Sequence, residues 1–87
     1  MTKSYYTSLC RAWLDHNVLG RPSEKERLIE LTCGEDNIER TCEWIIDRLN
    51  ESDDASRTHL ELLGNIDKID FLLLAGRLSE DYAAVLA

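Results

Sequence analysis

The chain has 87 residues, of which 44% are hydrophobic and 31% charged, a balance that indicates a folded globular domain rather than a disordered chain. The formal net charge of −7 disfavours nucleic acids and anionic membrane surfaces as partners, because binding to either requires clustered lysine and arginine. We expect a single domain over residues 1–87, with one modest core and no deep cleft. The chain ends without a polar tail, which fits a domain excised from a longer protein.

The sequence also indicates a cytoplasmic protein. Residues 1–6 lack the apolar core of a secretory signal, and the longest apolar run, residues 71–75, is too short to span a bilayer. The cysteines are odd in number and do not have the spacing of a disulfide framework, so we expect reduced thiols at Cys10, Cys33 and Cys42.

Helical spacing of apolar residues predicts three helices in the first part of the chain, over about residues 4–18, 24–33 and 37–50. Ser23 and Glu26 match a capping box at the start of the second helix, and Asp36 and Glu39 repeat the pattern at the start of the third. The third helix is the clearest, because its apolar residues form a single stripe: Ile38, Cys42, Ile45, Ile46 and Leu49.

Three further helices are expected over about residues 55–63, 68–78 and 80–87. Their cap signals are Asp53 or Asp54, Asp67, and Ser79. The segment 68–78 is apolar over most of its circumference, which is typical of a buried helix. A buried strand over residues 69–75 is the alternative, but a leucine-rich composition favours the helix. The sequence thus predicts an all-α fold, a compact bundle of five to six short antiparallel helices.

No catalytic or metal-binding pattern is present. Cys10 and His16 are six residues apart on one predicted helix and point apart, about 240° around its axis, so they do not form a nucleophile–base pair. His59 could meet a thiol only through a tertiary contact. We interpret the three thiols as small core residues and the paired carboxylates as helix caps, and we expect no enzyme, metal or cofactor. A hydrolase or redox enzyme that uses Cys33 or Cys42 is the remote alternative.

Trp44 does not fit the apolar stripe of the third helix. It lies about 200° from Cys42 and about 100° from Ile45 around the helix axis. Two interpretations follow. The indole either covers a neighbouring helix or forms an exposed aromatic anchor for a partner.

Five segments together resemble a known family. They are residues 9–19, which begin Leu-Cys-Arg-Ala-Trp-Leu, residues 28–31, residues 39–49, residues 60–63 (Leu-Glu-Leu-Leu) and residues 69–73 (Ile-Asp-Phe-Leu-Leu). They are similar to the first five helices of a caspase-recruitment domain (CARD), a member of the death-fold superfamily. The resemblance covers the chain from about Leu9 to Leu78. The segment before Leu9 is shorter than is usual in that family.

The resemblance implies a six-helix Greek key without catalysis. It implies homotypic recruitment, in which a basic face on the first and fourth helices of one copy meets an acidic face on the second and third helices of another. The basic face would include Arg11 and Arg57, and the acidic face Glu35, Asp36, Glu39 and Glu43. Such contacts do not close on themselves, so oligomers would form with rising concentration. The implied role is an adaptor that brings an effector to an immune, cell-death or antiviral complex.

A second hypothesis follows from the distribution of charge. Residues 51–87 hold −5 of the net charge of −7. An acidic chain of this size could be a phage or immunity protein that inhibits a nucleic-acid-handling partner by covering its basic surface.

Overall fold

Five α-helices and one turn of 3-10 helix make up the computed structural model of the protein, which describes residues 2–53 and 56–83. The elements are α1 (Thr2–Asn17), α2 (Pro22–Thr32), α3 (Asn37–Glu51), α4 (Arg57–Gly64), η1 (Ile66–Lys68) and α5 (Phe71–Ala83). No strand occurs within these ranges, which confirms the all-α prediction. The strand alternative for residues 69–75 is wrong, because α5 begins at Phe71 and continues through the leucines.

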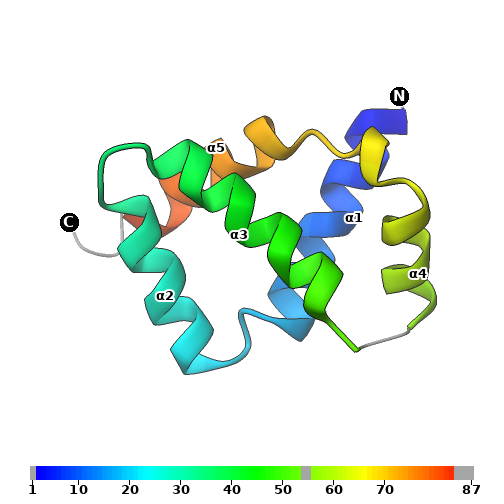
Figure 1. The fold of residues 1–87 in the computed structure, drawn as a ribbon, viewed down its shortest axis with the longest axis horizontal. Helices are drawn as coiled ribbons and strands as arrows, with labels where there is room; N and C mark the ends of the chain where they lie inside the picture. The colour runs from blue at the N-terminus through cyan, green and yellow to red at the C-terminus, as the bar shows by residue number, and fades with distance from the viewer. Residues whose placement is uncertain (1, 54–55, 84–87) are drawn as a thin grey trace.

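The helices pack around α3, which crosses the middle of the molecule (Figure 1). α5 crosses behind the first half of α3, and α2 flanks that pair on one side. α1 and α4 pack together at the opposite end, and η1 joins α4 to the start of α5 beside the amino terminus. This arrangement leaves the α2–α3 turn and the first turn of α5 at the periphery.

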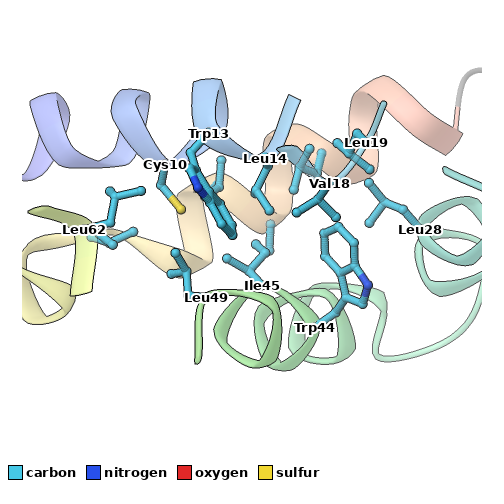
Figure 2. Close-up of a cluster of buried hydrophobic side chains, with 14 of the residues drawn as sticks. Cys10, Trp13, Leu14, Val18, Leu19, Leu28, Trp44, Ile45, Leu49 and Leu62 are labelled. Atoms are coloured by element: carbon cyan, nitrogen blue, oxygen red, sulfur yellow. The ribbon is translucent and has the colours of Figure 1, made fainter. Parts of the chain in front are cut away.

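The core lies between α1, α3 and α5, with α2 and α4 closing its two ends (Figure 2). Every helix contributes at least one buried residue with 2% or less of its surface exposed, including Trp13, Leu28, Ile45, Leu62 and Leu78. The periodic apolar residues of the sequence therefore form one contiguous core, as expected for a small helical domain.

The capping boxes predicted for α2 and α3 are not observed. Arg21 is the N-cap of α2 and Pro22 follows at N1, where its fixed φ suits the helix, so Ser23 lies inside the first turn. Asp36 is the N-cap of α3, but its backbone is left-handed (φ 57°) and its side chain caps no N–H group. Neither capping box forms.

The caps of α4 and α5 also differ from those predicted. Ser56 caps α4, and its hydroxyl accepts a 3.1 Å hydrogen bond from the N–H of His59. Asp53 precedes this cap, and Asp54 lies outside the described residues. Asp67 lies within η1, whereas the Oδ1 atom of Asp70 accepts from the N–H of Leu73 at 3.1 Å in the first turn of α5.

Two of the predicted helices are one. Ser79 is 7% exposed and lies inside α5, which runs to Ala83 without a break. Neither neighbour of Ser79 in the chain is a glycine or proline that would end the helix, so the Ser79 cap signal does not interrupt it. Over the described residues the bundle has five α-helices, and positions 84–87 of the predicted sixth lie outside them.

Candidate functional site

Four predicted binding carboxylates lie in a row along the α2–α3 turn and α3. All four side chains are exposed, and we call the set the acidic ridge: Glu35, Asp36, Glu39 and Glu43. Glu39 and Glu43 are one helical turn apart and thus share a side of α3. Within the described part of the chain, none of the four has a salt bridge. The ridge is therefore a line of negative charge without countercharges from this chain.

The negative charge extends from the ridge to the start of α5. The thiol of Cys42 donates to the carbonyl oxygen of Phe71 at 3.3 Å, which joins α3 to α5. Burial raises the pKa of this thiol, and the carboxylates of Asp70, Glu39 and Glu43 raise it further. Asp70 therefore belongs to the same electrostatic environment as the ridge.

Two leucines beside Asp70 are exposed. Leu72 has 68% of its surface exposed and Leu73 has 45%, whereas Leu74, Ala75 and Leu78 form the buried face of α5. The prediction of a fully buried helix is thus wrong for the first turn of α5. Only one face of the helix packs against the core, and the two leucines lie outside that face. The two exposed leucines are an apolar surface that the fold does not use.

The predicted basic face offers less free positive charge than the sequence indicated. Arg11 donates from Nε to Asp15 at 3.1 Å and from Nη1 to Asp81 at 2.9 Å, so two carboxylates counter its charge. Arg57 is exposed in the first turn of α4 and has no salt bridge to any described residue. Arg57 is therefore the member of this pair that is free to meet a partner's carboxylate.

Trp44 is not an exposed anchor. Only 5% of its surface is exposed, and its ring lies in the core between α3 and α2, beside Val18 (Figure 2). The alternative interpretation, that the indole covers a neighbouring helix, agrees with this burial. Trp44 is therefore removed from the set of exposed partner-binding residues.

The three thiols and two imidazoles differ widely in exposure. Cys10 is buried and Cys42 half-buried, but Cys33 is exposed, so the prediction of three core thiols is wrong for Cys33, which follows the last residue of α2. His16 is exposed, while His59 is 3% exposed and stacks on Trp13. Within the described ranges, no three His, Cys, Asp or Glu side chains are grouped so that they could hold a metal ion.

Sequence reasoning missed a polar cluster between α2 and α3. An oxygen of Glu24 lies 3.5 Å from Nη1 of Arg48. Arg48 lines two hollows, of about 470 Å³ and about 190 Å³, and Glu24 lines the larger one. Three buried polar atoms here have no hydrogen-bond partner within residues 2–53 and 56–83: Glu24 Oε2, Trp44 Nε1 and Arg48 Nε. No local motif signals this cluster, because it depends on the contact between two helices.

Among the described helices, none has both the length and the apolar character that a membrane crossing requires. Comparison with protein-family models, with curated proteins and with solved structures finds no match for this chain. Functional inference therefore depends on the surfaces described above.

Proposed function

We propose that the chain is a non-enzymatic interaction module that binds a protein partner through the acidic ridge and the adjoining Leu72 and Leu73. The observation that carries this proposal is that α3, whose ridge carboxylates have no salt bridge to the described residues, packs against α5, whose first turn exposes two leucines. Cys42 links α3 to α5, since its thiol donates to the Phe71 carbonyl. Burial raises the pKa of this thiol, and the nearby carboxylates of Asp70, Glu39 and Glu43 raise it further.

Each part of this surface favours association. Covering an exposed leucine stabilises a complex by up to about 1.5–3 kcal/mol, because apolar surface is removed from water. The carboxylates contribute less affinity but select a basic partner and speed its approach. The expected partner surface is therefore apolar at its centre and basic at its rim.

In the CARD-like form of this proposal, the partner is another domain of the same kind and the chain is an adaptor in immune, cell-death or antiviral signalling. The acidic ridge is one of the two faces that this form requires. Exposed Arg57 supports the other face, whereas the pairing of Arg11 with Asp15 and Asp81 weakens it. Each exposed ion pair contributes about 0–1 kcal/mol, so a homotypic contact would be weak and would need avidity.

The acidic inhibitor is the second candidate. The excess of unpaired negative charge favours it. The ridge offers four carboxylates without salt bridges among the described residues, while Arg11 is already paired. In this form the chain remains monomeric and covers a basic surface of an unrelated protein.

Light scattering against concentration separates the two forms. Homotypic assembly requires a mass that rises with concentration and that falls back to the monomer in both Glu43→Lys and Arg57→Glu. The control is Glu80→Lys, an exposed charge reversal on α5 outside both faces, which should assemble like the parent. A chain that stays monomeric at millimolar concentration contradicts the CARD-like form.

A basic amphipathic peptide of leucine and lysine tests the binding surface itself. Binding should weaken steeply with salt, weaken in Glu43→Lys and weaken again in Leu72→Gln. If the peptide binds Leu72→Gln and Glu43→Lys as tightly as the parent, the proposed surface is wrong in both forms.

A further inference from the structure

The indole N–H group of Trp44 is buried without an acceptor among the described residues. The residue is 5% exposed, and no hydrogen bond from its Nε1 atom to the described part of the chain occurs. Figure 2 shows the ring rising from α3 with its nitrogen turned toward α2. Buried donors are almost always paired in native proteins, because an unpaired one loses its hydration and gains nothing in return. Among the described residues, this donor therefore lacks the acceptor that its burial calls for.

A second buried donor lies one helical turn away. Arg48 follows Trp44 by four residues on α3, and its Nε atom is also buried without a partner. Glu24 holds the other end of this guanidinium through Nη1 at 3.5 Å. Trp44 and Arg48 are both lining residues of the hollow of about 190 Å³ between α2 and α3. The Arg48 guanidinium thus has an ion-pair contact at Nη1 and, among the described residues, an unfilled hydrogen-bonding position at Nε.

The walls of this hollow are rich in arginine. Arg27 and Arg40 line it together with Arg48. Arg40 has no salt bridge to the described residues, and Arg27 has only a 3.8 Å contact with Glu30. The Nη1 atom of Arg40 lies 3.4 Å from the position that a Cβ atom on Gly34 would take, at the end of α2. Three guanidinium groups from two helices therefore surround one small space.

Two carboxylates of the chain also line the hollow, Glu43 and Asp47. Neither accepts a hydrogen bond from the Trp44 indole or from Arg48 Nε. The buried donors thus remain unpaired although acceptors of the right charge are near. A free ligand with several oxygens, which can reach more than one donor at once, satisfies the site better than either side chain does.

We propose that the hollow between α2 and α3 binds an oxyanion, a phosphate or carboxylate group, through the Trp44 indole N–H and the guanidinium groups of Arg48 and Arg40. A volume of about 190 Å³ has room for such a group, since one water occupies about 30 Å³ in the liquid. The site shares Glu43 with the acidic ridge, but its proposed ligands, Trp44, Arg48 and Arg40, are not part of the proposed protein-binding surface. Either proposal could fail without the other.

Nuclear magnetic resonance of the ¹⁵N-labelled full chain tests the site directly. The protein has two tryptophans, so its spectrum contains two indole N–H resonances, which Trp44→Phe assigns. Titration with inorganic phosphate should move the Trp44 resonance downfield to saturation and leave that of Trp13 in place. A parallel titration with acetate decides the source of the oxygens. A response to phosphate alone indicates a phosphate group, and a response to both indicates any oxyanion, including a carboxylate side chain.

Variants of the lining residues sharpen the test. Arg40→Gln should weaken phosphate binding about tenfold, because it removes a charge-assisted hydrogen bond. Asp47→Asn should strengthen binding, because it removes a like charge from the wall. Arg77→Gln, an exposed substitution on α5, is the matched control and should bind like the parent. The proposal is overturned if sodium chloride of equal ionic strength produces the same shift, if the Trp44 resonance does not move, or if Arg40→Gln binds as tightly as the parent.

Discussion

The imidazole of His59 lies nearly parallel to the indole of Trp13, with ring centroids 5.2 Å apart and ring planes 11° apart. The Nε2 atom of His59 is 2.8 Å from the carbonyl oxygen of Leu49, so this nitrogen carries the hydrogen and donates it. Leu49 lies in the last turn of α3, where carbonyls lack partners within the helix. One side chain on α4 thus stacks on α1 and caps the end of α3.

Two substitutions of His59 separate these roles. His59→Phe keeps a stacked ring but leaves the Leu49 carbonyl without its donor, and we expect it to lower the free energy of unfolding by about 1–2 kcal/mol. His59→Ala also removes the ring and should cost about 3–4 kcal/mol in total. Urea unfolding followed by far-ultraviolet circular dichroism measures both values. Equal costs would mean that stacking on Trp13 contributes nothing.

The ion pair between Arg11 and Asp81 joins α1 to the last part of α5, with 2.9 Å between Nη1 and Oδ2. Both side chains are partly exposed, so we expect a coupling of about 0.5–1 kcal/mol in a double-mutant cycle of Arg11→Gln and Asp81→Asn. Screening should remove most of this coupling at about 1 M salt. A coupling that is unchanged at high salt would contradict an electrostatic origin.

This pair also determines how a charge reversal at Arg11 should be interpreted. Arg11→Glu would place three carboxylates together, since Asp15 and Asp81 already surround the position. Loss of self-association in that variant would therefore report reduced stability as well as a lost contact. Arg57→Glu is the cleaner test of a basic face, because Arg57 is exposed and has no salt bridge to the described residues.

The Cys10 thiol should make the fold sensitive to alkali. Burial raises its pKa from 9.0 to about 12, so between these values the unfolded chain loses a proton that the folded chain keeps. The unfolded state then binds fewer protons, and the free energy of unfolding falls as pH rises, by up to about 1.4 kcal/mol per pH unit. Burial also raises the pKa of Cys42 and of Tyr82, which act in the same direction. This contribution to stability is complete below the pKa of the unfolded thiol and is lost above it.

Cys10→Ala isolates this effect. The variant should be less stable near neutral pH, by about 1 kcal/mol for the lost packing, but its stability should fall less steeply with alkali. Urea midpoints measured between about pH 8 and about pH 11 give both slopes. Parallel curves for the parent and Cys10→Ala would show that other groups cause the alkaline loss.

The positions of the helices could be predicted from the sequence because several apolar residues at helical spacing each indicate the same buried face. The stripe through Ile45 and Leu49 locates α3 within a residue of its observed bounds. The ends of helices could not be predicted so well, because a cap depends on one residue and its backbone angles. Asp36 illustrates this, since its left-handed backbone cannot be read from its identity.

Some surface features could be expected from the sequence and others could not. The four carboxylates of the acidic ridge were expected from the resemblance to a CARD, and all four are exposed. The burial of Trp44 and the exposure of Leu72 could not be predicted, because each depends on whether another helix covers that position. The arginine-lined hollow depends on the crossing of α2 over α3, and such a long-range contact leaves no local signal.

A pair of serines tests the difference between a cap pattern and an actual cap. Ser56 precedes α4 and its hydroxyl accepts from the His59 N–H group, so Ser56→Ala should lower the free energy of unfolding by about 1 kcal/mol. Ser23 matches a capping box with Glu26 but lies inside the first turn of α2, behind Pro22, so Ser23→Ala should change stability by less than about 0.5 kcal/mol. Because alanine has a higher helix propensity than serine, any change in the free energy of unfolding of Ser23→Ala should be an increase. Urea unfolding of the two variants under one set of conditions makes the comparison, and a larger loss in Ser23→Ala than in Ser56→Ala would contradict the observed start of α2.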